Sequence, residues 1–173
     1  MLAAFGLAQM LATVPVVPSE PVDTPVTRRP TPAIEYSGFY HTRLKIHRIG
    51  SFAMIPFFAG SYITGQKLIN GDAPDWARRL HGPFAAGTGV LFGVNTITGV
   101  WNLWDSRKDP AGRTKRWIHS LMFLAADAGF AYAAIQAPGH RESEGSTASR
   151  HRDVALVSMG LSVTSWGLML FFK

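Results

Sequence analysis

Four long runs with almost no charged residues constrain this chain more than any other feature. They cover residues 49–69, 84–104, 118–137 and 154–172. Each has the length of about 20 residues that crosses a hydrocarbon core of roughly 30 Å, whereas buried helices of soluble proteins are usually nearer a dozen residues. Charged residues make up 16% of the chain, against roughly 25% in soluble domains. The sequence therefore predicts an all-α integral membrane protein.

The predicted architecture is a four-helix transmembrane bundle over residues 37–173. Its spans are expected at about 43–69, 77–104, 114–137 and 150–172. The segments 72–75 and 109–110 each combine Asp with Pro, which predicts an Asp N-cap and a Pro near the first helical position.

Residues 1–36 form a separate N-terminal segment in this interpretation. Residues 1–17 are apolar but lack the basic start of a signal peptide, so we expect an interfacial helix, with a fifth partial span as the alternative. Six prolines follow between residues 14 and 32 and predict an extended linker. A minimal bundle does not need such a segment. It therefore favours contact with other membrane subunits or a second copy of the chain.

The basic residues predict the orientation, and their distribution argues against a nucleic-acid role. Eleven Lys and Arg lie on the side that holds the N-terminus and the loop between spans two and three, and six lie on the other side. By the positive-inside rule, the N-terminus is expected in the cytoplasm, and the protein in the inner membrane of a bacterial cell. The net charge of +6 is thus divided between two membrane faces instead of forming one patch for nucleic acid.

Four of the six histidines recur near the start of the four spans. They are His47, His81, His119 and His151. In antiparallel spans, the first and third helices begin at one membrane face and the second and fourth at the other. His47 is therefore expected to face His119, and His81 to face His151. Two imidazoles at each face are what a bis-histidine b-type haem requires, so we expect two b haems bound by these four residues as axial ligands.

Two further patterns fit bound haem. Small residues stand four positions after three of these histidines, at Ser51, Ala85 and Ala155, and leave space for a flat macrocycle, whereas Met122 and Phe123 follow His119. Arginines also flank the histidines and can pair with haem propionates. These arginines are Arg48, Arg78, Arg79, Arg116, Arg150 and Arg152.

Other interpretations of the histidines remain open. Each one taken singly fits an ordinary polar residue at a membrane interface, and His41 or His140 can replace a misassigned ligand. Binding of a bare metal ion is less favoured, because the pairs lie at opposite faces without carboxylate or thiolate companions. The absence of cysteine excludes thiolate zinc sites, iron–sulfur clusters and covalent haem attachment.

The chain resembles the four-helix, four-histidine core of the cytochrome b561 family. The resemblance spans residues 40–172 and rests on histidine number and spacing, on the basic-x-His-small element at 79–82 and on His119-Ser120. It implies axial ligation by first-with-third and second-with-fourth helix pairs, and electron transfer across a membrane between two b haems. The flanking spans and ascorbate-site motifs of six-helix members are missing, so ascorbate and ferric reductase activities are not implied.

Asp127 is the one acidic residue deep within a predicted span. A carboxyl group there is costly in lipid and is expected to face the bundle interior. It can act as a polar clamp bonded to Asn95, Thr96 or Thr98, or take part in proton uptake coupled to haem or quinone chemistry.

Three functions follow from these features. The first is an oxidoreductase-type electron carrier that passes electrons from a donor such as a quinol or a cytochrome to an acceptor across the membrane. The second is a haem-bearing accessory or anchor subunit of a larger respiratory or photosynthetic complex, and the third is a cofactor-free structural membrane subunit. Hydrolytic chemistry is not expected, because no Cys nucleophile, nucleophile elbow or phosphate-binding loop is present.

Overall fold

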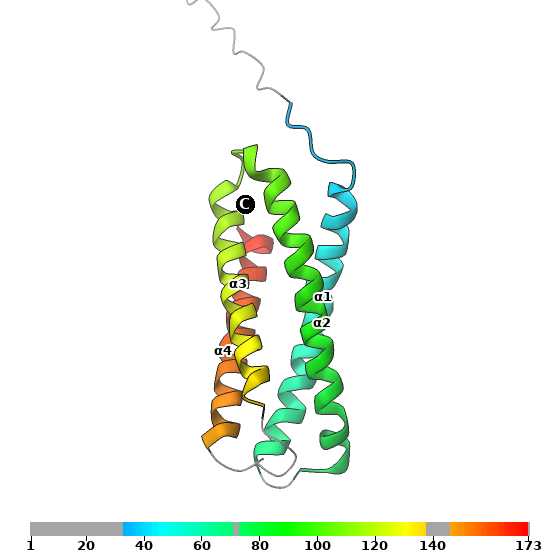
Figure 1. Cartoon of the computed structure of the whole chain (residues 1–173), viewed down its shortest axis with the longest axis vertical. Helices are drawn as coiled ribbons and strands as arrows, with labels where there is room; N and C mark the ends of the chain where they lie inside the picture. The colour runs from blue at the N-terminus through cyan, green and yellow to red at the C-terminus, as the bar shows by residue number, and fades with distance from the viewer. Residues whose placement is uncertain (1–32, 71–72, 138–145, 173) are drawn as a thin grey trace, which may run out of the picture. The chain divides into compact units, whose positions relative to one another are not determined.

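A computed structural model describes residues 33–70, 73–137 and 146–172. Most of the predicted N-terminal segment, together with His140 and Arg141, lies outside these residues. The described part contains four α-helices and one short 3-10 helix, and no strand. The helices are α1 (Tyr40–Ile69), α2 (Asp75–Asp105), α3 (Arg113–Ile135) and α4 (Ser146–Phe171), with η1 (Ser106–Lys108) following α2 (Figure 1). The predicted all-α fold with four helices is confirmed.

Three of these helices are long and apolar enough to cross a membrane. They are α2 with the η1 turn, α3 and α4, and at most 22% of the most apolar part of each is buried within the protein. Most residues of these stretches are therefore not covered by other parts of the protein, as lipid contact requires. The protein thus has the helices of a multi-pass membrane protein. Helix α1 is a continuous helix of 30 residues, but it contains Pro56 and several Ser, Thr and Gly residues, so its composition is less apolar.

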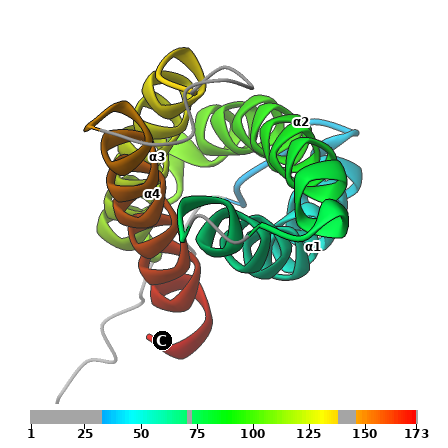
Figure 2. The ribbon, with the colours of Figure 1, turned by 90° about the horizontal axis from the view of Figure 1, so that it is seen from below.

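The four helices surround a common axis in chain order (Figure 2). Helices α1 and α2 pack closely as one antiparallel pair, and α3 and α4 pack as a second. The two pairs meet more loosely through α2 with α3 and through α1 with α4. Helix α1 therefore lies diagonally opposite α3, and α2 lies opposite α4.

An aromatic cluster fills the middle of the bundle. Phe58, Phe92 and Phe123 are buried there with Met54 and Ala126. The rings of Phe92 and Phe123 stack with their centres 4.7 Å apart, and Phe58 lies 5.9 Å from Phe92. In a bundle surrounded by lipid, the close packing of these rings from three helices contributes to helix association.

The predicted Asp N-caps were wrong. Pro74 occupies the N-cap position of α2, and Asp75 is the first residue of that helix. Helix α3 is preceded by Gly112 in the left-handed conformation, with φ 64°. Asp109 instead accepts a hydrogen bond from the backbone N–H of Ala111, so it closes the turn that leads to α3. The error arose because Asp also favours such turns, and sequence alone does not separate the two uses.

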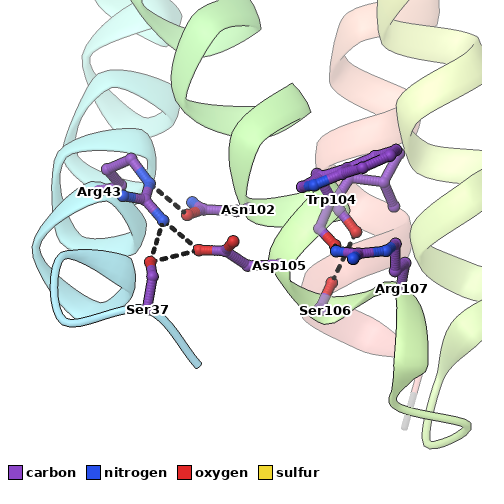
Figure 3. A network of polar contacts seen from close by, with 8 residues as sticks. Ser37, Arg43, Asn102, Trp104, Asp105, Ser106 and Arg107 are labelled. Carbon is purple, nitrogen blue, oxygen red and sulfur yellow. Dashed lines mark hydrogen bonds and ion pairs between the residues drawn. The ribbon is translucent and has the colours of Figure 1, made fainter. Parts of the chain in front are cut away.

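A polar network joins the beginning of α1 to the end of α2 (Figure 3). The Arg43 guanidinium forms an ion pair with Asp105 and donates to Asn102 Oδ1 and to Ser37 Oγ. Ser37 Oγ in turn donates to Asp105 over 2.5 Å. Because both members of the ion pair are largely buried, with 14% and 13% of their side chains exposed, the network holds these helix ends together.

Candidate functional site

The four span-start histidines form two pairs in the structure. His47 of α1 faces His119 of α3, with ring centres 6.0 Å apart and an angle of 85° between the ring planes. His81 of α2 faces His151 of α4, with ring centres 6.3 Å apart and an angle of 76°. We refer to them as the His47 site and the His81 site. Each site joins diagonally opposite helices, so each lies on the axis of the bundle.

At the His47 site, both rings are held through Nδ1 by the neighbouring helix. His47 Nδ1 lies 3.1 Å from the carbonyl oxygen of Asn95 and 3.2 Å from the hydroxyl of Thr98. His119 Nδ1 lies 2.9 Å from the carbonyl oxygen of Ser165 and 2.8 Å from its hydroxyl. The Ser165 hydroxyl itself donates to the His119 carbonyl, so it is an acceptor toward the ring.

The His81 site repeats this arrangement with one difference. His81 Nδ1 lies 2.9 Å from the hydroxyl of Thr64, and the Ser61 carbonyl lies beside the same ring. His151 Nδ1 lies 2.8 Å from the carbonyl oxygen of Ala133. Alanine supplies no hydroxyl there, so three of the four rings contact a hydroxyl in addition to a carbonyl and the fourth contacts the carbonyl alone.

These contacts determine which ring nitrogen is free. A carbonyl oxygen only accepts hydrogen bonds, so Nδ1 must carry the proton in His47, His119 and His151. The Thr64 hydroxyl donates to the Gly60 carbonyl and therefore accepts from His81 Nδ1, which gives His81 the same tautomer. In a neutral imidazole this leaves Nε2 unprotonated, with its lone pair available to a metal. Metal-ligating histidines are typically oriented in this way, by donating the other ring N–H to a carbonyl or carboxylate.

The four residues whose carbonyls lie beside the rings share one spacing from the histidine of their own helix. Ser61 and Asn95 each lie fourteen residues after the histidine of their own helix, and so do Ala133 and Ser165. Each helix therefore carries a histidine for one site and, about 21 Å further along its axis at 1.5 Å per residue, a carbonyl for the other. The two sites are separated by the same distance along the bundle.

Two glycines make room for the rings of α1 and α2. A Cβ atom on Gly99 would lie 3.0 Å from His47 Cε1, and one on Gly65 would lie 3.2 Å from His81 Cε1. Both separations are tighter than ordinary van der Waals contact. Each glycine follows the Thr that contacts the same ring, so Thr64-Gly65 and Thr98-Gly99 are paired positioning elements.

A cavity of about 800 Å³ adjoins the His81 site. Both His81 and His151 line it, as do Ala85 and Ala155, the small residues expected to leave space beside them. The volume lies within the range of about 300–1,000 Å³ typical of small-molecule and cofactor sites. Ser61 is also among the lining residues, and its buried Oγ has no hydrogen-bond partner within the described residues. An orphaned buried hydroxyl is costly, which indicates a site for a bound group.

The predicted propionate partners occupy different environments. Arg152 lines the cavity and pairs with Asp153, and Arg78 lines it as well. Arg48 and Arg79 are exposed, and neither lines the cavity. The Arg116 guanidinium donates to the backbone carbonyls of Ser106, Asp109 and Ala111, so it stabilises the turn before α3. Arg150 is part of α4.

Asp127 lies on α3 between the levels of the two histidine sites. It lines the cavity, and its carboxylate accepts a hydrogen bond from the Thr96 hydroxyl of α2. Of the three partners considered from the sequence, the structure thus selects Thr96. Asn95 and Thr98 contact His47 instead.

The residues that hold the histidine rings were not identified from the sequence. They are Ser61, Thr64, Gly65, Asn95, Thr98, Gly99, Ala133 and Ser165. A signal was available for α1 and α2, because Ile-Thr-Gly occurs at residues 63–65 and again at 97–99. These two copies are 34 residues apart, as are His47 and His81, so each histidine and its Thr-Gly element recur together.

Comparisons with known proteins give no match to a family model, a curated protein or a solved structure. Within residues 33–70, 73–137 and 146–172, no cluster of three or more His, Asp or Glu offers a site for a metal ion held by protein ligands alone.

The two histidine pairs do fit a metal carried within a planar cofactor. An imidazole nitrogen binds a metal at about 2.0 Å, so two axial imidazoles place their ring centres about 6 Å apart. The observed separations are 6.0 and 6.3 Å. The free Nε2 atoms, the cavity and the small residues beside His81 and His151 agree with the same group.

Proposed function

We propose that this chain is a membrane electron-transfer protein that binds two b-type haems, one at the His47 site and one at the His81 site. The observation that carries the proposal is the paired geometry of the four histidines, each held through Nδ1 by a carbonyl or hydroxyl oxygen of the adjacent helix. Haem iron, when bound, supplies reversible one-electron oxidation and reduction.

The residues of the chain perform the remaining tasks. His47, His119, His81 and His151 are the proposed axial ligands, and the carbonyls and hydroxyls on their Nδ1 atoms fix the rings and increase their basicity. Arg78 and Arg152 are the arginines that line the cavity, so they are the proposed partners of propionates at the His81 site. The aromatic cluster between the sites excludes water from the middle of the bundle.

The proposal includes four membrane spans, with α1 as the fourth. Pro56 and the polar residues of α1 are tolerated because α2 packs along the helix and contacts its hydroxyl-bearing face. The excess of Lys and Arg supports a cytoplasmic location for the beginning of α1. One site then lies near each membrane face, and electrons pass between a donor and an acceptor on opposite sides.

Removal of one ligand at a time tests the assignment of sites. We expect His47→Ala and His81→Ala each to retain one haem per chain, since each change affects one site and leaves the other about 21 Å away. The measurement is a pyridine haemochrome count on purified protein made with haem available. His41→Ala is the matched control, because His41 is exposed and belongs to neither pair, and it should retain two. Loss of both haems from a variant that remains folded contradicts two independent sites.

A further inference from the structure

The position of Asp127 sets it apart from every other carboxylate in the described helices. It is eight residues after His119 and six before Ala133, whose carbonyl marks the level of His151. At 1.5 Å per residue, these separations correspond to about 12 Å and about 9 Å along α3. Asp127 therefore lies between the two histidine sites, within a helix apolar enough to span the membrane.

The surroundings of Asp127 provide one hydrogen-bond donor and no counter-ion. Thr96 Oγ1 donates to its carboxylate, and none of the ion pairs among the described residues includes it. The other titratable or charged groups that line the same cavity are Tyr62 of α1, Arg78 and His81 of α2, and His151 and Arg152 of α4. Asp127 is the acid among them, so any negative charge in the cavity lining belongs to it.

The cavity connects Asp127 with the end of the bundle. Its lining extends from Arg78 and Ala148, near the starts of α2 and α4, to Gly93 and Asp127 in the interior. Glycines at 82, 89 and 93 line this path, and a Cβ atom at each of them would meet nothing within 4 Å, so the path is open at these positions. The part of this lining that a cofactor at the His81 site leaves open can carry a proton from the aqueous phase to the carboxylate without crossing the aromatic cluster.

We propose that Asp127 is a proton-binding site that takes up one proton when an electron enters the His81 site. This inference rests on the proposed function. An electron from the donor lowers the charge of the cavity by one, and a proton from the aqueous phase then converts the Asp127 carboxylate to the acid and restores the charge. On oxidation the electron leaves for the acceptor and the proton returns to water. The two charges are coupled strongly because the interior has a low dielectric constant.

Asp127→Asn separates this role from that of a clamp between α2 and α3. The amide oxygen of Asn still accepts from Thr96, so the bond between the helices is retained, whereas Asn binds no proton. The midpoint potential of the wild-type chain should fall as pH rises, and Asp127→Asn should lose that dependence while keeping two haems. Asp75→Asn, at the exposed start of α2, is the matched control and should behave as wild type.

A second readout follows the carboxyl group directly. The infrared difference spectrum of reduced minus oxidised wild-type protein should show a protonated-carboxyl band that is missing in Asp127→Asn.

Thr96→Val removes the donor that stabilises the carboxylate. The pH range over which the midpoint potential varies should therefore move to higher pH, and Thr96→Ser should restore the wild-type range.

Two results separate the possible failures. The role of Asp127 is overturned if both haems bind but the midpoint potential depends on pH equally in wild type and Asp127→Asn. It is also overturned if reduction of the wild-type protein produces no carboxyl band. Either result leaves the proposed function intact. Wild-type protein that binds no haem overturns the proposed function itself, and this inference with it.

Discussion

At the scale of single residues, the contact made by one ring nitrogen of each histidine determines what the other can do. All four Nδ1 atoms are engaged by an adjacent helix, and three of them also meet a hydroxyl. The rings therefore enter the axis of the bundle with fixed orientation and with Nε2 free. This preorganisation distinguishes them from interfacial histidines, which are free to turn toward lipid headgroups or water.

Gly99→Ala tests how much the ring position matters. The added methyl would lie 3.0 Å from His47 Cε1 and push the ring by a few tenths of an ångström. We expect haem affinity at the His47 site to fall about tenfold or more, as for other changes to groups that orient metal ligands, while the His81 site stays filled. Haem titration of the apoprotein measures the affinity of each of the two sites.

The matched control is Gly160→Ala, also in a helix but with nothing within 4 Å of the new methyl. It should leave both affinities unchanged and stabilise α4 by up to about 1 kcal/mol. Equal haem binding by Gly99→Ala and wild type contradicts a positioning role for this glycine.

At the scale of helices, the sequence predicted the elements well and their contacts only in part. Apolar runs of spanning length predicted four helices, and antiparallel order predicted which histidines would meet, because both follow from chain direction. The Nδ1 acceptors depend on the register between adjacent helices. Three of the four rings contact a hydroxyl as well as a backbone carbonyl, and His151 contacts the carbonyl of Ala133 alone. A backbone carbonyl has no signature in the sequence, and only the repeated Thr-Gly elements gave a clue.

A hydrogen bond links the segment before α1 to the turn before α3, and the pH range over which it stabilises the fold can be predicted. Tyr36 donates to Asp109 over 2.8 Å. The pKa of Asp109 is held below its ordinary value of 3.8 by the Ala111 N–H and then by the Tyr36 hydroxyl. The same bond raises the pKa of Tyr36 above 10.0. Its stabilising effect is therefore lost when pH falls through the lowered pKa of Asp109, and when pH rises through the raised pKa of Tyr36.

Tyrosinate absorbance as a function of pH tests this bond. The difference between wild type and Tyr36→Phe isolates the titration of Tyr36, which should move to lower pH in Asp109→Asn, because the carboxylate that favours the neutral phenol is gone. Asp75→Asn serves as the control and should not move it. A Tyr36 titration that is the same with and without the Asp109 carboxylate contradicts the contact.

At the scale of the whole molecule, two equivalent helix pairs build two histidine sites about 21 Å apart along a common axis. Each pair supplies one ligand and one acceptor to each site, so neither pair completes a site alone. The aromatic cluster separates the sites, and Asp127 provides the acid between them. This arrangement suits a chain that moves an electron along its axis and balances the charge with a proton.

The most direct measurement of the central claim is the reduced-minus-oxidised visible spectrum of the purified full chain, combined with a haem count. We predict sharp α and Soret bands and two b haems per chain. A single haem per chain contradicts the assignment of one of the two sites. Protein produced with haem available that shows no Soret absorbance contradicts the account as a whole and leaves a structural membrane subunit.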